Sequence, residues 1–374
     1  MSPPPSLDVV GPFRGSSGYD RHTREFVRGM ARQGARIRLF PLEGWSIDLP
    51  EHARDPWFDG LTEPVQADTV LHFTMPPQAR PVPGLRSVNY TMFEAERIPP
   101  AWASAAAQHD LVVVPTEVCR AAWVASGVPE QAVAVCPLGI DPSFADPAEP
   151  LALVDASGRA VSSYARRLLN VAELRPRKNH LGLIRCWARA TTADDDAVLI
   201  LKLTAFQPRT VTQFREDLMA MVAAYGLDLA QAAPIVFLVG FITDAELRSL
   251  YRTATHYVSL SHGEAWDQAM MEAIASGLLP VAPRHSAYVE YLTDADAELL
   301  PAAPVAARFE GRMGAEDRVF FDGLRWWEAD EEAAAAALRG LVRGTAPPRP
   351  SPRDRILSTY GWDRASVRLL GILS

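Results

Sequence analysis

The feature that most constrains the fold is a repeated alternation of short apolar runs with segments of helical periodicity. In the first half of the chain the apolar runs are residues 7–10, 36–40, 69–73, 86–90, 111–114 and 132–136. In the second half they are residues 168–172, 197–203, 235–239, 256–260 and 278–282. Near-continuous apolar strands with helices between them predict mostly parallel sheets that are covered on both faces.

A polar, loop-like stretch separates the two series and suggests two domains. Residues 142–163 are rich in Pro, Asp, Ala and Ser. We place an N-terminal Rossmann-like domain at residues 1–155 and a C-terminal one at residues 156–353. The expected fold class is α/β, with two doubly wound domains that face each other across a cleft. In such sheets ligands bind beyond the carboxyl ends of the strands.

Helix signals support the same architecture. Thr243 and Glu246 form a capping-box pattern, which predicts Thr243 as the N-cap of a helix. Other helical patterns cover residues 21–32, 116–126, 328–342 and 363–373.

Composition narrows the class of function. With 48% hydrophobic and 22% charged residues the chain predicts a folded protein, and its formal net charge of -8 argues against a dedicated nucleic-acid binder. The three cysteines, Cys119, Cys136 and Cys186, have neither disulfide nor zinc spacing, which fits a reducing cytosol. Since neither a signal peptide nor a membrane-spanning run is recognisable, we expect a cytoplasmic protein. Scattered arginines leave peripheral contact with the inner membrane face open.

The sharpest local pattern is residues 261–277, which follow a strand and run into a helix. Glu264 and Glu272 are eight positions apart, and on one helix their backbones would be separated by about 12 Å, too far for a glycosidase pair. With Glu264 on the loop and Glu272 in the helix, the free amides at the helix start would form an anion site between two carboxylates. Those amides belong to Trp266, Asp267, Gln268, Ala269 and Met270. A nucleotide sugar has this layout, whereas an isolated pair of this kind is more often one exposed and one capping glutamate.

A second pattern, residues 173–184, places two cations at a helix start. Arg177 and Lys178 oppose the helix dipole there and therefore call for an anion. A solvated basic turn is the alternative. Lys202, at the end of the next strand, is a third candidate cation, with snorkelling to solvent as its alternative.

The first domain offers weaker signals. Gly15, Ser16, Ser17 and Gly18 follow the first strand, and small residues let a backbone approach an anion closely, although such a loop is more often a tight turn. Further polar residues at or after strand ends would face the cleft, where each alone is more often structural: His72, Tyr90 and Glu94.

Metal and nucleophile motifs are not recognisable. Residues 194–196 and 294–296 resemble a metal-binding DxD, but they lie in polar loops and fit solvated turns better. We find no GxSxG elbow, no HExxH and no Cys/His nucleophile pair, so we expect neither a metal nor a cofactor.

Four segments, taken in order, resemble a known family. Residues 133–141, 174–179, 237–247 and 264–272 look like those of retaining glycosyltransferases of family 4, which have the GT-B fold. The resemblance extends over residues 11–362, nearly the whole chain. Residues 90–99 are similar to a subset of the family that is often attached to polysaccharide or glycan assembly.

This resemblance implies a role for each candidate residue. Arg177 and Lys178 would hold the donor diphosphate, Glu264 would lie near the donor sugar, and Glu272 would bind the ribose. Residues 15–18 would approach the diphosphate from the other domain. Phe241 and Ile242 would lie beside the base, and the final helix, residues 354–374, would return to the N-terminal domain.

The expected activity is transfer of a hexosyl group from a UDP- or GDP-linked sugar to a glycan, lipid-linked or small-molecule acceptor, without a metal. One departure bears on it: Asp267 lies in a stretch where the family usually has Gly-Phe/Trp-Gly-Leu-Pro. A carboxylate near a diphosphate is unfavourable unless it is paired or points away. Two alternatives stay open: a GT-B glycoside phosphorylase, and a non-catalytic sugar-nucleotide-binding subunit, which Asp267 and Gln268 suggest.

Overall fold

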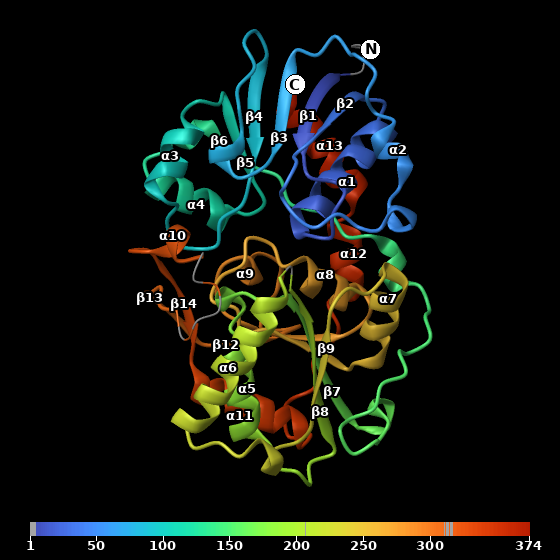
Figure 1. The fold of residues 1–374 in the computed structure, drawn as a ribbon, viewed down its shortest axis with the longest axis vertical. Coiled ribbons are helices and arrows are strands. Elements are labelled where there is room, and N and C mark those ends of the chain that lie inside the picture. Colours follow the sequence, from blue (N-terminus) through green and yellow to red (C-terminus); the bar gives the residue numbers. More distant parts are fainter. Residues whose placement is uncertain (1–4, 206, 310, 312–313, 315–316) are drawn as a thin grey trace. The chain divides into compact units, whose positions relative to one another are not determined.

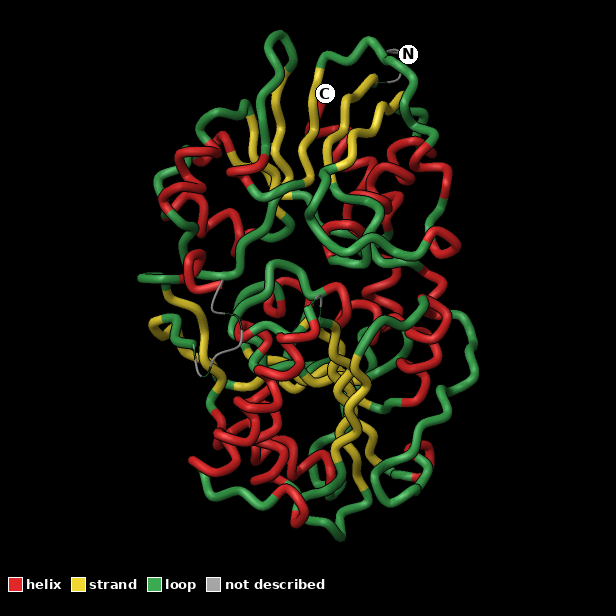
Figure 2. Tube along the Cα trace, viewed as in Figure 1, coloured by secondary structure: helices red, strands yellow, loops and turns green. Residues whose placement is uncertain are grey.

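Two parallel six-stranded sheets organise the chain (Figures 1 and 2). The computed structural model describes residues 5–374 apart from 206, 310, 312–313 and 315–316. The chain divides into two compact units, Met1–Asp141 with Thr359–Ser374, and Pro142–Ser358. The predicted α/β class with parallel sheets is confirmed.

The sheet of the first unit has the order β2-β1-β3-β4-β5-β6, with all neighbours parallel. Its strands are β1 (Ser6–Gly11), β2 (Arg36–Pro41), β3 (Thr69–Phe73), β4 (Arg86–Tyr90), β5 (Leu111–Val114) and β6 (Val133–Val135). Its helices are α1 (Gly18–Arg32), α2 (Pro56–Asp59), α3 (Pro100–Ala106), α4 (Glu117–Ala125) and α13 (Trp362–Leu373).

Helix α1 covers the sheet through its apolar face. Phe26 stacks on Phe73 of β3 with ring centroids 5.6 Å apart, and it contacts Tyr90 of β4 at 5.2 Å. The C-terminal helix α13 packs on the same helix, since Trp362 lies edge-on to Phe26 at 5.3 Å and Arg32 pairs with Asp363.

The sheet of the second unit has the order β12-β11-β10-β7-β8-β9, again parallel. Its strands are β7 (Arg166–Glu173), β8 (Ala197–Thr204), β9 (Ile235–Val239), β10 (His256–Val258), β11 (Leu279–Pro283) and β12 (Glu298–Leu300). Its helices are α5 (His180–Ala190), α6 (Pro208–Ala224), α7 (Asp244–Thr253), α8 (Gln268–Ala275), α9 (Tyr288–Tyr291), α10 (Arg318–Phe321) and α11 (Glu331–Val342). Helix α12 (Arg353–Thr359) ends just past the boundary with the first unit.

Several bounds differ from the sequence-based expectation. The second unit ends at Ser358 rather than at residue 353, and the expected final helix over residues 354–374 is two helices, α12 and α13. The first unit ends at Asp141 rather than at residue 155, because residues 142–155 pack on the second unit: the Leu151 amide donates to Ser249 O at 3.1 Å and to Thr253 Oγ1 at 2.9 Å. The helix expected from residue 328 begins at Glu331, because residues 325–329 form strand β14. That strand pairs antiparallel with β13 (Ala302–Ala306), outside the main sheet.

Capping follows the sequence closely. Thr243 accepts a hydrogen bond from the Glu246 amide and completes the predicted capping box at the start of α7. Cys119, Cys136 and Cys186, all within the described residues, are buried and form no disulfide. Within the described part of the chain, none of the helices is long and apolar enough to span a bilayer.

Candidate functional site

Glu264 lies in the loop of residues 259–267, between β10 and α8. Its backbone is fixed on both sides by the segment that follows β11: its amide donates to Ser286 Oγ at 3.1 Å, and its carbonyl accepts from the Ala287 amide at 3.1 Å. Ser286 adopts a left-handed φ of 46°, a conformation that non-glycine residues rarely adopt. The position of Glu264 is therefore set by two loops at the carboxyl edge of the sheet.

The side chain of Glu264 is buried between two cations. Lys178 Nζ lies 2.6 Å from Oε1 and Arg177 Nη1 lies 3.0 Å from Oε2, while the Glu264 side chain is only 4% exposed. Burial alone would raise the pKa of Glu264, but the charges of Arg177 and Lys178 outweigh it and hold that pKa at about 2. Glu264 is therefore ionised at neutral pH.

Arg177 and Lys178 belong to a short 3-10 turn, Pro176–Lys178, between β7 and α5. Asn179 ends the turn at φ 51°, accepts from the Gly182 amide at 3.1 Å to cap α5, and donates to Leu260 O at 3.0 Å. The His262 amide donates to Arg177 O at 2.8 Å. The two patterns recognised in the sequence thus meet in space, and the anion that the two cations face is Glu264.

Asp267 caps helix α8 and changes the expected anion site. It has a left-handed φ of 60°, its Oδ1 accepts from the Met270 amide at 3.2 Å, and its Oδ2 accepts from Tyr288 Oη at 2.7 Å. Of the amides expected to be free at this helix start, that of Met270 is therefore occupied. Burial and the nearby Glu264 charge raise the pKa of Asp267 to about 6. Both oxygens of the Asp267 carboxylate thus accept hydrogen bonds, one from its own helix and one from Tyr288.

The other candidates of this loop and helix lie beside Asp267. Trp266 is buried, with its carbonyl accepting from Tyr291 Oη at 2.9 Å, while Gln268 and Ala269 are half-buried in the first turn of α8. Glu272 lies inside the same helix, where Tyr251 Oη of α7 donates to its Oε2 at 3.0 Å. The Glu272 side chain is buried in the second unit.

Lys202 lies at the end of β8, beside the turn that follows β9. Its ammonium donates to Thr204 Oγ1 and to Gly240 O, both at 2.6 Å, and burial lowers its pKa to about 8. Snorkelling to solvent does not describe this side chain, since Lys202 is 5% exposed. The next residues after Gly240 are the expected base contacts: Phe241 is exposed and Ile242 half-buried.

In the first unit, the Gly15–Gly18 loop donates hydrogen bonds to the carboxylate of Asp20. The amides of Gly15 and Ser17 donate to Asp20 at 2.7 and 3.1 Å, and Ser17 with Asp20 forms the capping box of α1. These two amides are therefore not available to a phosphate, which corrects the expected role of the loop. Among the four residues, this leaves the amides of Ser16 and Gly18 as candidates.

The three residues expected on the acceptor side are placed differently from one another. Tyr90 is fully buried, with its ring packed on Phe26 and its hydroxyl bonded to Cys136 O, so it is a core residue rather than an acceptor contact. His72 is also buried, near His109, and burial lowers its pKa to about 4. Glu94 is half-buried beside Tyr19, whose pKa its charge helps to raise.

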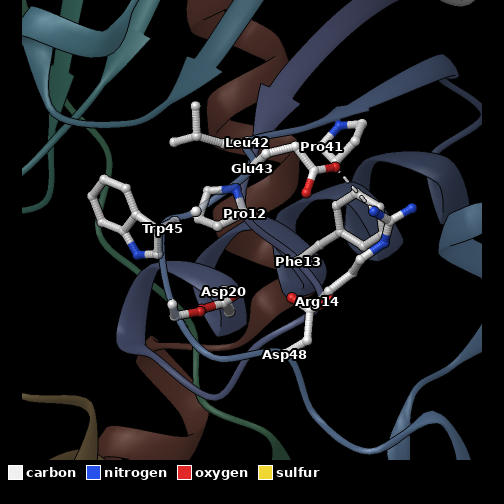
Figure 3. A pocket seen from close by; sticks show the side chains of 11 residues that line it. Pro12, Phe13, Arg14, Asp20, Pro41, Leu42, Glu43, Trp45 and Asp48 are labelled. Atoms are coloured by element: carbon white, nitrogen blue, oxygen red, sulfur yellow. Dashed lines mark hydrogen bonds and ion pairs between the residues drawn. The ribbon is translucent and has the colours of Figure 1, made fainter. Parts of the chain in front are cut away.

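A small polar pocket in the first unit was not anticipated from the sequence (Figure 3). It lies between the turn after β1 and the loop after β2, where Trp45 Nε1 donates to Ser17 Oγ at 3.1 Å and Arg14 pairs with Glu43 at 3.1 Å. In the second unit, Ser286 and Tyr288 were also missed. The available signal was their position directly after β11, because polar residues at that edge meet the other strand ends.

The two acidic stretches, residues 194–196 and 294–296, form turns, as the sequence predicts. Asp195 accepts from the Thr192 amide at 2.6 Å, and Asp296 accepts from the Thr293 amide at 2.9 Å. Within the residues described, no three His, Cys, Asp or Glu side chains are grouped as metal ligands.

Comparison with known proteins identifies the fold. No protein-family model and no curated protein matches the sequence. Sucrose-phosphate synthase from Thermosynechococcus elongatus matches over 99% of this chain and 98% of its own, with a TM-score of 0.66 and 14% identity. HepE from Anabaena, in complex with UDP and glucose, matches over 98% and 99%, with a TM-score of 0.61 and 12% identity. A glycosyltransferase from Rickettsia africae matches over 98% and 97%, with a TM-score of 0.61 and 14% identity. The chain therefore shares the GT-B fold of these proteins.

Proposed function

We propose that the protein is a retaining glycosyltransferase of the family 4 type that uses a UDP- or GDP-linked sugar. The observation that carries this proposal is the buried cluster of Arg177, Lys178 and Glu264 at the carboxyl edge of the second sheet. Two cations meet at one buried carboxylate there, and a diphosphate would bind to the same two cations. The similar HepE chain has been solved with UDP and with UDP-glucose, which supports a nucleotide-sugar donor.

The proposed chemistry needs charge stabilisation more than proton transfer by a side chain. The bond between the sugar and the diphosphate breaks, and a bond from the acceptor oxygen forms on the same face of the sugar. Arg177 and Lys178 stabilise the charge that develops on the diphosphate, and Glu264 orients the donor sugar. The acceptor proton passes to the departing phosphate oxygen, so neither a general base nor a metal is required.

The remaining roles follow the same donor orientation. Glu272 binds the ribose, Phe241 and Ile242 contact the base, and Lys202 supplies a further cation near that turn. Binding of the donor weakens the ion pairs of Arg177 and Lys178 with Glu264, since the diphosphate and the Glu264 carboxylate compete for the same N–H groups. We place the reaction in glycan or polysaccharide biosynthesis.

Asp267 favours one alternative, a non-catalytic subunit that binds sugar nucleotides. The Asp267 carboxylate lies close enough to Glu264 and Lys178 for their charges to shift its pKa: Glu264 raises this pKa and Lys178 lowers it. A diphosphate on Lys178 would feel that negative charge, which weakens binding and slows departure of the leaving group.

The proposal is tested by thermal stability against UDP, GDP, ADP, CMP and their sugar conjugates, with inorganic phosphate alongside. Ligand binding to the folded state raises the melting temperature by mass action. The disabling variant combines Arg177→Gln, Lys178→Met and Glu264→Gln, so that no member of this ion-pair cluster keeps its charge without its partner. The matched control is Arg215→Gln on the exposed face of α6.

A shift with one nucleoside diphosphate, lost in the triple variant and kept in the control, supports a nucleotide-sugar site. A shift with phosphate and with no nucleotide would replace the proposal by a phosphorylase. A shift that survives in the triple variant would remove Arg177 and Lys178 from the site.

A further inference from the structure

Strands β13 and β14, together with Phe309 and α10, form an arm that lies outside the six-stranded sheet. Strands β13 and β14 pair antiparallel, from Ala302 opposite Ala329 to Ala306 opposite Arg325, and α10 lies between them along the chain. Trp326 contacts Phe309 and Phe321 with ring centroids 5.3 and 5.6 Å apart, which gives the arm a small aromatic core. The described residues of the arm therefore pack on one another through these strands and rings.

The arm is hydrogen-bonded to the loop that carries Glu264. Both backbone polar groups of Trp327 bond to His262: the Trp327 amide donates to His262 O at 2.8 Å, and His262 Nδ1 lies 3.0 Å from Trp327 O. The imidazole of His262 also stacks on Trp326, with centroids 4.4 Å apart and planes 14° from parallel. Burial lowers the pKa of His262 to about 4, so the ring is neutral at pH 7 and donates from Nδ1.

The arm also contacts the other two segments that build the site. The Trp327 indole stacks on His285 at 5.2 Å and 11°, and His285 directly precedes Ser286, the acceptor for the Glu264 amide. Asp317 pairs with Arg175 at 2.9 Å, beside the turn that bears Arg177 and Lys178. One element thus touches all three loops on which the cations and the carboxylate depend.

His262 connects the arm to two of the charged residues, Arg177 and Glu264. Its own amide holds Arg177 O at 2.8 Å, and the Arg177 guanidinium bonds to Gly263 O and to the Glu264 carboxylate. A shift of His262 would therefore move both Arg177 and Glu264. Displacements of about 1 Å at such a site can change rates by about a hundredfold.

We propose that the arm is a positioning element, in which Trp327 acts through His262 to fix Arg177 and Glu264 in the geometry needed for sugar transfer. The inference rests on the proposed function, because it assigns the arm a role in that reaction. Neither Trp327 nor His262 needs to touch the donor. The role predicts a loss of turnover that exceeds any loss of nucleotide binding.

The first experiment removes the arm without disturbing its roots. Ala303 lies opposite Glu328 in the ladder, so residues 304–327 can be replaced by Asn-Gly, which closes a two-residue hairpin. Release of UDP or GDP from UDP-glucose or GDP-mannose is measured, together with the Kd of the free nucleotide. We expect kcat to fall by about tenfold or more while the nucleotide Kd changes by less than about threefold.

A pair of point variants separates positioning from folding. His262→Asn keeps an N–H donor for Trp327 O, whereas His262→Phe keeps an aromatic ring on Trp326 and loses that donor. We expect His262→Asn to retain most of kcat and His262→Phe to lose most of it, at similar melting temperatures. Val319→Ser on α10, at a side chain 75% exposed, is the control and should match the wild type.

A second readout needs no nucleotide. Lys178 and Lys202 are the only two lysines of the chain, so acetylation of each is resolved by mass spectrometry. We expect Lys178 to react several times faster, relative to Lys202, in the truncated protein and in His262→Phe, because its partner Glu264 is displaced.

The outcomes distinguish this inference from the proposed function. A wild type that releases nucleotide, with truncated and His262→Phe proteins of equal kcat, overturns the role of the arm alone. Unchanged Lys178 labelling in those variants contradicts it as well. A wild type that neither binds nor turns over any sugar nucleotide overturns the proposed function, and the role assigned to the arm with it.

Discussion

Lys178 and Glu264, 86 residues apart in the sequence, form a buried ion pair with 2.6 Å between Nζ and Oε1. Their segments follow β7 and β10, which are neighbours in the sheet. Because the carboxyl ends of parallel strands meet at one edge, this topology brings a basic turn and an acidic loop together. Each charge is the reason that the other can be buried.

A double-mutant cycle should show strong coupling between these two residues. Lys178→Met leaves the buried carboxylate to Arg177 alone, and Glu264→Gln leaves two cations without their carboxylate. We expect each single change to lower the free energy of unfolding by about 3 kcal/mol. The double variant should lose less than the sum, with a coupling of about 1–3 kcal/mol in urea unfolding. Additive losses would contradict a direct pair.

Asp267 should make nucleotide binding depend on pH. Its pKa is raised to about 6, so the carboxylate is mostly charged at pH 8 and mostly neutral at pH 5. If the diphosphate binds Arg177 and Lys178, we expect its Kd to be about threefold to tenfold higher at pH 8 than at pH 5.

The matched variant is Asp267→Asn. Asn tolerates the left-handed conformation and can still cap α8, but it carries no charge. We expect it to bind nucleotide diphosphate more tightly at pH 8 and to flatten the pH dependence in calorimetric titrations. An equal pH dependence in both proteins would show that Asp267 does not sense the ligand.

The fold was predictable because its strands are short and nearly continuous in Val, Ile and Leu. Strands such as β5 and β8 are buried on both faces, so their composition alone reports a parallel sheet. The proximity of Arg177, Lys178 and Glu264 was predictable, because both patterns follow strand ends and the carboxyl ends of parallel strands share one edge. What a single pattern could not reveal was that these charges pair with one another.

The misses have physical causes. Tyr90 ends a strand like a cleft residue, yet its ring lies on the side of the sheet that α1 covers. The Gly15–Gly18 loop has the small residues of an anion site, but Asp20, one turn into the helix, takes two of its amides. The role of Asp20 could have been suspected, because Ser17 and Asp20 have the spacing of a capping box.

The arm shows a different limit. One of its strands, β13 (Ala302–Ala306), has little strand propensity. In the sequence Glu328 continues the helical pattern that follows it, so a helix was predicted to begin there, whereas the helix begins at Glu331. Pairing between β13 and β14, rather than local preference, sets these strands. The contacts of Trp327 with His262 and His285 join segments about forty to sixty-five residues apart, and no local pattern records them.

Replacing Lys202 should stabilise the protein and weaken donor binding. The ammonium is buried, and within the described part of the chain no carboxylate pairs with it. We expect Lys202→Met to raise the free energy of unfolding by about 1–2 kcal/mol at pH 7.5. The same variant should raise the Kd for nucleoside diphosphate.

The pH dependence gives the control. Because the pKa of Lys202 is lowered to about 8 in the folded protein, the unfolded chain binds more protons between pH 8 and its ordinary value of 10.5. Wild-type stability should therefore gain a contribution as pH rises through this range, and Lys202→Met should lack it. Lys202→Arg keeps the charge and should not stabilise. A destabilised Lys202→Met would mean that the hydrogen bonds to Thr204 and Gly240 outweigh burial of the charge.

Buried histidines should make the protein sensitive to acid. Burial lowers the pKa of His22, His180 and His285 to about 3, from an ordinary value of 6.5. Between these values the unfolded chain takes up protons that the folded chain refuses. The free energy of unfolding should therefore fall as pH falls below about 6.5, by up to about 1.4 kcal/mol per pH unit for each histidine.

His22→Phe tests this account at one site. Both ring nitrogens of His22 are buried without a hydrogen-bond partner, among Phe26, Phe73 and Tyr90. We expect His22→Phe to raise the melting temperature more at pH 5 than at pH 7.5. The exposed His52→Gln is the matched control and should change neither. An equal gain at both pH values would assign the effect to packing instead.

The central claim, that the Arg177, Lys178 and Glu264 cluster works on a sugar nucleotide, is tested most directly by turnover. Release of nucleoside diphosphate from UDP- and GDP-linked sugars is followed for the wild type and for Glu264→Gln, with free-nucleotide affinity measured in parallel. We predict release by the wild type and a loss of about a hundredfold or more in Glu264→Gln, with the bare nucleotide still bound. No release from any donor by the folded wild type, or undiminished release by Glu264→Gln, would contradict the claim.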